Sequence, residues 1–294
     1  MYQIPETELI LNNDGSVYHL NLLPEDIAHT VINVGDPDRV KMVTGFFDSV
    51  EIRKQKREFI TQTGTYQDKR ITVISTGIGT DNIDIVYNEL DALVNIDLKS
   101  RTIKEKKTSL NLIRIGTSGA LREDIAPDDF VFSKFGLGLD GLLNYYKYSN
   151  SEEEEKIISA FRAYYPSRGI FPMPYLFSCS PMLEEKISAG MKKGITASCS
   201  GFYAPQGRAL RFQLSNPGMI DRLSDFGYDR WRITNFEMET GAMYGLASIL
   251  GHQCCSVNVI VANRITKKHS HRADESMKEM IELVLARVSK LHSE

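Results

Sequence analysis

The stretch ITVISTGIGTDNIDIVYNELDAL, residues 71–93, holds a strand, a turn and a helix in succession. Five of its first six residues are apolar or β-branched, which is typical of a strand covered on both faces of a sheet. Its second half predicts a helix over 82–94 with one buried face, because apolar side chains recur there every three or four positions. These side chains are Ile83, Val86, Leu90 and Leu93. A buried strand that leads through a glycine turn into an amphipathic helix is the repeating unit of α/β folds.

The same alternation of strand and helix patterns runs through the rest of the chain. Further strands are predicted at TVINV (30–34), NLIRI (111–115), DFVFS (129–133), ITASCS (195–200) and CCSVNVIVA (254–262). We therefore predict an α/β fold, a three-layer sandwich in which helices flank a central mixed, mostly parallel sheet.

Three more helices follow from apolar periodicity or from start signals. They are predicted near 181–192, over 236–250 and over 277–291. Ser180 and Pro181 suit the N-cap and the first position of the first of these helices. Thr234 and Glu237 form a capping-box pattern at the start of the second.

No linker rich in proline, glycine or serine divides the chain, so we predict one domain over residues 1–294. Two polar segments within it are predicted insertions, at 97–109 and 144–175. The second contains the acidic run Glu152–Glu155. We interpret this run as a solvated helix start, because adjacent carboxylates point in different directions around a helix and do not converge on one cation.

The chain has 294 residues with Lys+Arg 35 and Asp+Glu 38, so its formal net charge is −3. That balance gives no support to binding of nucleic acid or of an anionic membrane. No apolar run approaches the ~18 residues of a membrane helix, and the start MYQIPETELI does not resemble a signal peptide. The cysteines show no metal-binding spacing, so we expect a cytoplasmic protein with reduced thiols. They are Cys179, Cys199, Cys254 and Cys255.

Three glycine turns are predicted to follow strands. They are Gly35–Arg39, Thr76–Gly79 and Gly116–Gly119. Such turns leave backbone N–H groups free to face an anion, at the edge of the sheet where α/β proteins bind ligands. Arg39 ends the first turn and Arg114 precedes the third, which together indicate a pocket for phosphate or a carboxylate. The run Gly136–Gly141 also matches GxGxxG, but no helix pattern follows it, so we do not predict a dinucleotide site.

Eight segments occur in one order along nearly the whole chain. They are SVYHLNL (16–22), GDPDRV (35–40), KREF (56–59), STGIGTDNIDIVYNEL (75–90), IRIGTSGAL (113–121), GFYAPQGR (201–208), NFEMETGAMYGLASILGH (235–252) and VIVANR (259–264). In these segments the chain resembles the nucleoside phosphorylase family. The GDPxR, RIGTSG and EMET motifs are specific to that family, and the FxxxQxR pattern in 202–208 is similar to its uridine branch.

The resemblance implies a pentosyltransferase that cleaves uridine reversibly with phosphate to give uracil and ribose 1-phosphate. Deoxyuridine and thymidine are further candidate substrates. Phosphate is a co-substrate, and no cofactor is implied. The resemblance assigns phosphate binding to Gly35, Arg39, Arg57, Arg114 and Thr117, with Arg57 supplied by a neighbouring subunit. The implied catalytic residues are Arg39, Arg114, Thr117, Glu239 and Arg208.

The resemblance also assigns residues to the sugar. They are Met238, Glu239, Glu237 and, across a subunit interface, His19. We expect Glu239 to hold the ribose hydroxyls and Glu237 to cap its own helix, because residues two apart on a helix do not face the same way.

The resemblance assigns binding of the base to another set of residues. They are Tyr18, Phe202, Gln206, Arg208, Val261 and Ala262. A carboxamide and a guanidinium match the polar edge of uracil, whereas cytosine would set a donor against a donor.

Three positions depart from the family pattern. Purine-specific relatives carry an aspartate where this chain has Asn263 and Arg264, which argues against a purine enzyme. Ala262 stands where relatives often have a larger apolar side chain, which predicts a roomier base pocket. Some relatives hold a monovalent cation, such as potassium, through a glutamate that corresponds to Glu58 and through a serine, but Asn82 occupies the serine position.

Other functions remain open from the sequence alone. A nucleosidase would use water in place of phosphate, and would need a carboxylate acid–base pair rather than three arginines. A purine nucleoside phosphorylase and a non-catalytic nucleoside-binding protein are further alternatives on the same fold. The resemblance also implies a homodimer, or a hexamer built of dimers, with active sites shared between subunits.

Overall fold

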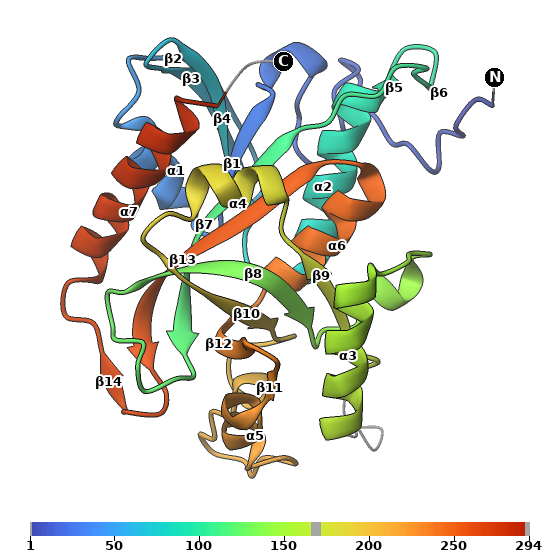
Figure 1. The fold of residues 1–294 in the computed structure, drawn as a ribbon. Coiled ribbons are helices and arrows are strands. Elements are labelled where there is room, and N and C mark those ends of the chain that lie inside the picture. The colour runs from blue at the N-terminus through green and yellow to red at the C-terminus, as the bar shows by residue number, and fades with distance from the viewer. Residues whose placement is uncertain (1, 166–171, 292–294) are drawn as a thin grey trace.

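The computed structural model describes residues 2–165 and 172–291, and Figure 1 shows its ribbon. Among these residues, twelve strands form one sheet. They are β1 (Thr30–Val34), β2 (Ser49–Lys56), β3 (Phe59–Tyr66), β4 (Lys69–Ser75), β7 (Asn111–Ala120), β8 (Phe130–Gly138), β9 (Tyr175–Ser178), β10 (Lys192–Ser198), β11 (Gly227–Tyr228), β12 (Trp231–Glu237), β13 (Gln253–Asn263) and β14 (Lys268–His269). A separate hairpin joins β5 (Ile96–Asp97) to β6 (Thr102–Ile103).

The strand order is β11-β12-β10-β8-β13-β7-β1-β4-β3-β2, with β9 beside β8 and β14 beside β13. Strands β4, β1, β7 and β13 run parallel to one another, as do β8, β10 and β12. Strand β13 joins the two blocks by antiparallel pairing with β8, and β2 and β3 extend one edge as an antiparallel hairpin. The sheet is therefore mixed, as the sequence predicts.

Helices cover the sheet from both sides (Figure 1). They are α1 (Pro37–Thr44), α2 (Thr80–Asn95), α3 (Glu152–Tyr164), α4 (Pro181–Ile187), α5 (Met219–Asp225), α6 (Thr240–Leu250) and α7 (Ala273–Val288), with short 3-10 helices at Pro24–Asp26, Leu142–Tyr145 and Ala204–Gln206. Helix α1 packs on β1, β3 and β4, and α4 and α7 pack on β13. Helix α6 packs on β8 and β10, with α2 against it. The α/β class, with helices flanking a central sheet, is confirmed.

Strand β12 has two neighbours in the sheet besides β11, and this closes part of the sheet on itself. It runs parallel to β10, and it also pairs antiparallel with β7 through Asn235↔Ala120 and Phe236↔Gly119. Strands β12, β10, β8, β13 and β7 thus form a ring. The ring brings the chain that leaves β12 against the end of β7, two segments far apart in sequence.

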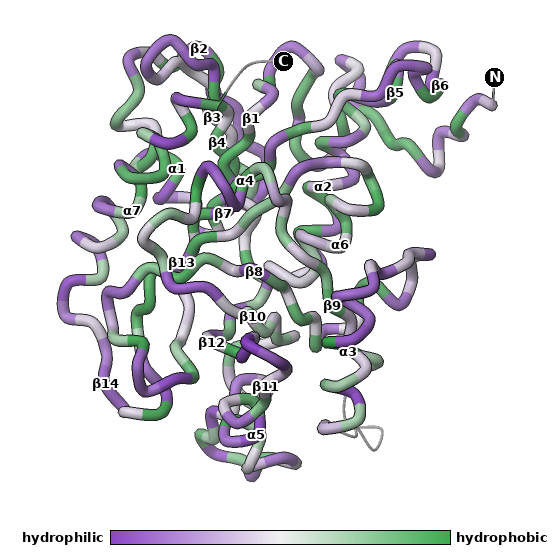
Figure 2. The backbone as a smooth tube through the Cα atoms, in the orientation of Figure 1, coloured by the Kyte–Doolittle hydropathy of each residue, from purple (hydrophilic) through white to green (hydrophobic). Residues whose placement is uncertain are grey.

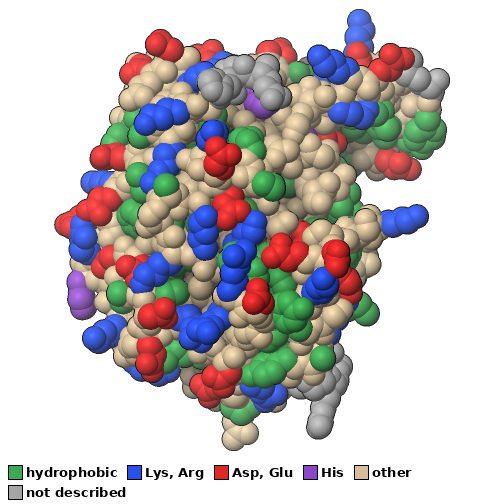
Figure 3. Space-filling view, viewed as in Figure 1, with side chains coloured by type: hydrophobic (Ala, Val, Ile, Leu, Met, Phe, Trp, Pro, Cys, Tyr) green, Lys and Arg blue, Asp and Glu red, His purple; other side chains and the backbone are tan. Residues whose placement is uncertain are grey.

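Buried hydrophobic side chains fill the space between the sheet and the helices. The larger cluster includes Ile113 and Val257 from the strands and Leu90 and Val284 from the helices. Figure 2 shows hydrophobic residues along the strands and along the helices. On the face shown in Figure 3, acidic and basic side chains are interspersed. Within the described ranges, no helix is long and apolar enough to cross a membrane.

Three predicted helices have wrong boundaries, and one of them is α7, which spans Ala273–Val288 rather than 277–291. Helix α6 begins at Thr240 rather than 236, and Thr234 and Glu237 belong to β12, so the predicted capping box does not form. Pairing with β10 holds that segment extended. Helix α4 ends at Ile187 because the chain soon enters β10, although the predicted cap is confirmed by a hydrogen bond from the Leu183 N–H to Ser180 Oγ.

The glycine pattern at 116–119 is also not a turn, because β7 runs through it to Ala120. The rejected GxGxxG match begins inside β8, with Gly136 and Gly138 both within the strand. It therefore does not form the strand-to-helix turn that a dinucleotide site needs.

Parts of both predicted insertions are described. The first, 97–109, contributes to the β5–β6 hairpin, and the second, 144–175, contains α3. Residues 166–171 of the second lie outside the described residues. The acidic run does start α3, but Glu154 is buried, where its carboxylate accepts hydrogen bonds from the backbone and hydroxyl of Ser178.

Candidate active site

A cavity of about 610 Å³ opens where β1, β4, β7, β12 and β13 end. Most of the residues predicted for the site line it: Gly35, Arg39, Glu58, Arg114, Thr117, Phe202, Gln206, Arg208, Glu237, Met238, Glu239, Val261 and Ala262. The volume suits a nucleoside-sized ligand. The other lining residues, which the sequence reasoning did not assign to a substrate, are Asp36, Pro37, Gly77, Ile78, Asn82, Ser118, Gly119 and Phe236.

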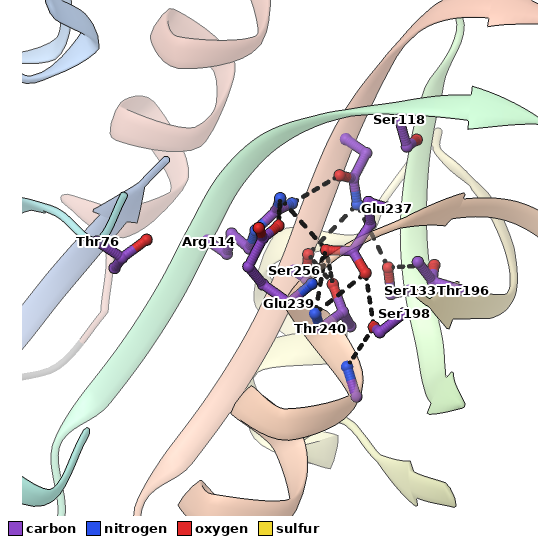
Figure 4. Close-up of polar contacts among 12 residues, drawn as sticks. Thr76, Arg114, Ser118, Ser133, Thr196, Ser198, Glu237, Glu239, Thr240 and Ser256 are labelled. Carbon is purple, nitrogen blue, oxygen red and sulfur yellow. Dashed lines mark hydrogen bonds and ion pairs between the residues drawn. The ribbon is translucent and has the colours of Figure 1, made fainter. Parts of the chain in front are cut away.

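Arg114 on β7 lines one end of the cavity, where it contacts two carboxylates. Its guanidinium is buried, and Nη2 donates to the Glu239 carboxylate at 2.6 Å and lies 3.2 Å from the Glu237 carboxylate (Figure 4). Two residues along the strand, Gly116 leaves the space that this guanidinium occupies, because a Cβ there would lie 1.8 Å from Nη1. The glycine that resembles a turn residue in the sequence is therefore a close-approach position.

The prediction that Glu237 and Glu239 face different ways is wrong. Both precede α6, and both carboxylates reach Arg114. Glu237 accepts hydrogen bonds from the Ser198 hydroxyl at 2.6 Å and from the Thr240 N–H at 3.0 Å. It thus does satisfy the start of α6, as predicted, although from the end of a strand.

Burial and the neighbouring charges shift the pKa values of Arg114 and Glu239. Burial alone would lower the pKa of Arg114, but the Glu237 and Glu239 carboxylates outweigh it and raise that pKa. Burial raises the pKa of Glu239, and the charge of Glu237 adds to this effect, while Arg114 opposes it. The Glu239 carboxylate also accepts a hydrogen bond from the Gly79 N–H at 2.8 Å.

Arg39 brings a second guanidinium to the same end. It lies on α1, which begins directly after β1, with Pro37 at its first position and the Asp36 side chain capping the Asp38 N–H. Burial lowers the pKa of Arg39, and the positive charge of Arg114 lowers it further. Two partly desolvated guanidinium groups that repel each other in one cavity favour an anion between them.

The opposite end of the cavity is built on the loop that follows β10. The Arg208 guanidinium stacks on the Phe202 ring at 3.8 Å, and its Nη1 donates to the Phe202 carbonyl at 2.7 Å and to the Gln206 side-chain oxygen at 2.6 Å. Arg264 stabilises this loop, since its Nη1 donates a hydrogen bond to the Gln206 carbonyl at 3.0 Å. Burial lowers the pKa of Arg208, and the charge of Arg264 adds to this.

The apolar wall of this end comes from β13. Its register against β7 shifts between Ile260 and Ala262, a bulge that brings two successive residues, Val261 and Ala262, to the cavity. Phe236 on β12 lies beside them on the cavity wall. The small Ala262 side chain is consistent with the predicted roomier pocket.

Three predicted site residues lie outside the cavity of their own chain: Tyr18, His19 and Arg57. They share one part of the surface, since Lys56, the neighbour of Arg57, places its ammonium 4.4 Å from the Tyr18 ring centroid. His19 is next in sequence and pairs through Nδ1 with Glu89 at 2.6 Å. Glu58 of the same hairpin does reach the cavity.

A metal site is not apparent in the described residues, where no group of three or more His, Cys, Asp or Glu side chains could hold an ion. A monovalent cation at Glu58 stays a prediction. The cysteines in the described ranges are free and buried, and burial raises the pKa of the Cys179 and Cys254 thiols to about 12.

Comparisons with known proteins agree with this architecture. Residues 29–294 match the model of the phosphorylase superfamily. A uridine phosphorylase of Thermococcus kodakarensis is 30% identical over 272 residues, which are 90% of this chain and 82% of the relative. A DeoD-type purine nucleoside phosphorylase of Bacillus cereus is 27% identical, over 91% of this chain and 96% of the relative.

Among solved structures, a nucleoside phosphorylase of Trypanosoma brucei that shows uridine phosphorylase activity superposes with a TM-score of 0.88 and 29% identity. The match covers 96% of this chain and 100% of that one. With the family model spanning nearly the whole sequence and relatives matched along most of their own length, the chain belongs to the phosphorylase superfamily.

Proposed function

We propose that this protein is a uridine phosphorylase, which converts uridine and phosphate reversibly into uracil and ribose 1-phosphate. The observation that carries the proposal is one cavity with two kinds of end. Arg39 and Arg114 face one end, and Gln206 and Arg208 face the other. An anion and a base with donor and acceptor groups on one edge fit these two ends.

At the anion end, the guanidinium groups of Arg39 and Arg114 hold phosphate with the Thr117 hydroxyl and the Gly35 backbone. A phosphate oxygen attacks C1′ of the ribose as the bond from C1′ to N1 of uracil breaks. Holding the two reactants together turns a bimolecular step into an effectively unimolecular one, an advantage of several kcal/mol. Glu239, beside Arg114, accepts hydrogen bonds from ribose hydroxyls and stabilises the positive charge that develops on the sugar.

At the base end, the electron pair of the broken bond moves into the uracil ring. The charge develops on O2 and O4, where the Gln206 amide and the Arg208 guanidinium donate hydrogen bonds. Phe202 and Phe236 offer ring faces to the base. No proton donor on the protein is required by this scheme.

Two alternatives from the same family use different groups. A purine enzyme would need an acid near the ring nitrogen, and the strand end that lines the base region here continues into Asn263 and Arg264. A nucleosidase would gain nothing from Arg39 and Arg114 at one end of the cavity. Both observations favour a pyrimidine phosphorylase.

The test is uracil release from uridine with and without inorganic phosphate, alongside thymidine and inosine. Phosphate-dependent release from uridine, with inosine turned over at least about a hundredfold less efficiently, supports the proposal. Phosphate-independent release would identify a nucleosidase. Comparable kcat/KM for inosine and uridine would contradict the proposed base choice.

We propose in addition that the active site is shared between two subunits of a dimer, which exists either alone or as part of a hexamer. We also propose that the protein acts in the cytoplasm. The support for the shared site is that Arg57, His19 and Tyr18 form one surface region outside their own cavity. A two-fold contact would bring two equivalent copies of this region to two cavities.

Subunit exchange between Arg57→Ala and Arg208→Ala variants tests the sharing. In a mixed dimer, one site receives both intact arginines and the other receives neither. Random exchange should restore about a quarter of wild-type activity by the symmetry of a two-site dimer. No recovery after demonstrated exchange would place Arg57 outside the partner's site.

A further inference from the structure

Asn258 on β13 is a buried residue that does not line the cavity, yet it contacts the central arginine of the anion end. Its side-chain oxygen accepts a hydrogen bond from Arg114 Nη1 at 2.7 Å. The carboxamide is fully buried. Since a guanidinium only donates, the oxygen of Asn258 must face Arg114 and its NH₂ must face away.

The strand register explains how the two side chains meet. Strands β7 and β13 pair in parallel with Ser256 opposite Arg114 and Asn258 opposite Gly116. Residues two apart on a strand share a face, so these four residues lie on one face of the sheet. Because Gly116 has no side chain, the Arg114 guanidinium can lie along the strand and reach Asn258.

The Nη2 side of the Arg114 guanidinium contacts the carboxylates of Glu237 and Glu239. The hydroxyl groups of Ser256 and Thr240 connect this side to Asn258. The Asn258 NH₂ lies 3.3 Å from the Ser256 hydroxyl, which lies 3.0 Å from that of Thr240. The Thr240 hydroxyl lies 3.0 Å from Glu237, whose carboxylate faces Arg114 (Figure 4). The hydrogen bonds therefore close a circuit that begins and ends at Arg114.

We propose that Asn258 is a positioning residue that fixes the Arg114 guanidinium for phosphate. Carboxylates alone pull Nη2 toward Glu237 and Glu239, where the ribose is expected. Asn258 holds Nη1 on the other side and sets the plane of the group, so that the donors not used in this clamp stay aimed into the cavity. A neutral acceptor does this without adding a negative charge that would repel phosphate.

The inference rests on the proposed function for the identity of the anion, and its test separates the two. Binding of inorganic phosphate is measured by titration calorimetry, and the KM values for phosphate and uridine are measured by uracil release. Asn258→Leu keeps the size and removes the acceptor. Its Kd and KM for phosphate should rise about tenfold or more, the usual effect of losing a hydrogen bond to a charged group, with uridine KM within about twofold of wild type.

Asn33→Leu is the matched control. Asn33 is a buried amide on β1, paired with Arg114 in the strand register but joined by hydrogen bond to Tyr87 instead. Both KM values of this variant should stay within about twofold of wild type, because the Asn33 side-chain oxygen accepts from Tyr87 and neither residue lines the cavity. If Asn258→Leu does not fold, as judged by circular dichroism, Asn258→Ser takes its place, with an expected rise in phosphate Kd of about threefold or more.

An unchanged phosphate Kd in the folded Asn258 variant overturns the inference. So does a parallel rise of phosphate and uridine KM, which would indicate a general structural role. If wild type binds phosphate but releases no uracil, the proposed function fails, and the effect of Asn258→Leu on phosphate binding still decides the role of Asn258.

Discussion

The two ends of the cavity differ in secondary structure and in the exposure of their side chains. At the anion end, Arg114 and Glu239 are 6% and 5% exposed, and hydrogen bonds from strands and a helix start hold them. At the base end, Phe202 is 51% exposed and sits with Arg208 on a loop whose nearest regular element is the short 3-10 helix at Ala204–Gln206. One end is preorganised inside the sheet, whereas the other is carried on a loop with an exposed Phe202 ring and a half-buried Arg208, although the Gln206 side chain is buried there.

This difference follows from the chemistry that each end is proposed to serve. Phosphate is a compact anion whose recognition gains from fixed, desolvated donors that do not reorganise during the reaction. A planar base enters from solvent, and a loop can close on it at low cost. Variants at the anion end should therefore damage both catalysis and stability, whereas variants at the base end should damage catalysis alone.

The largest effect is expected at Arg114. Arg114→Lys keeps a positive charge beside Glu237 and Glu239 but loses the planar fork, so kcat/KM for phosphate should fall about a hundredfold to a thousandfold in steady-state kinetics. Arg114→Ala should also lower the free energy of unfolding, by about 3–5 kcal/mol, because it leaves two buried carboxylates without their cation. A lysine variant within tenfold of wild type would contradict the assignment of phosphate to this end.

The next effect in size is expected at Arg208. Arg208→Ala should cost about 2–4 kcal/mol of transition-state stabilisation, measured as kcat/KM for uridine, because a charged donor to the departing base is lost. Its thermal unfolding should stay close to wild type. Arg211→Ala is the control on the same loop, since Arg211 contacts the exposed Phe212 ring rather than the cavity, and it should be nearly silent. Equal losses in the two variants would show that only the charge of the loop matters.

A smaller effect is expected from pH. Burial and the charge of Glu237 raise the pKa of Glu239 above its usual value of about 4.5. In the proposed mechanism, the ionised form of Glu239 accepts hydrogen bonds from the ribose hydroxyls. As pH falls through this raised pKa, the carboxylate is protonated and kcat/KM for uridine should fall, approaching tenfold per pH unit. Glu239→Gln should have low activity without this acid limb. The same limb in the Gln variant would assign the titration to another group.

The smallest effects are expected on the free energy of unfolding, which can be compared between one variant at each end. Ser198 donates to Glu237 at 2.6 Å and accepts from the Gly241 N–H at 2.7 Å, both buried. Ser198→Ala should lower the free energy of unfolding in urea by about 1–3 kcal/mol. Phe212→Ala on the base-end loop, where the ring is 76% exposed, should change it by no more than about 0.5 kcal/mol. The reverse order would break the distinction between the two ends.

Local patterns predict six strands of the sheet, β1, β4, β7, β8, β10 and β13, together with helices α2, α4, α6 and α7 and the arginines of the anion end, but they do not predict β2, β3, β9 or β12. TVINV at 30–34 is β1 without change, and Arg39 and Arg114 both line the cavity. Local reasoning was wrong where long-range pairing overrides it. The helix predicted over 236–250 includes Glu237, but pairing with β10 and β7 holds the segment of Glu237 in β12.

The glycine pattern at 116–119 predicts a turn, whereas the structure has Gly116 within strand β7. The actual role of Gly116, to make room for the Arg114 guanidinium, depends on the path of a neighbouring side chain. Likewise, nothing local indicates that Arg264 supports the loop of Gln206 or that β13 bulges at Val261. These features arise only when distant segments pair.

The central claim is that one cavity holds phosphate at Arg39 and Arg114 and the base at Gln206 and Arg208. A crystal structure with uracil and inorganic phosphate tests it most directly, because this pair cannot react and both ligands stay in place. The account predicts phosphate on the two guanidinium groups and the polar edge of uracil on Gln206 and Arg208. Phosphate bound at the Arg208 end, or uracil bound beside Arg114, would contradict it.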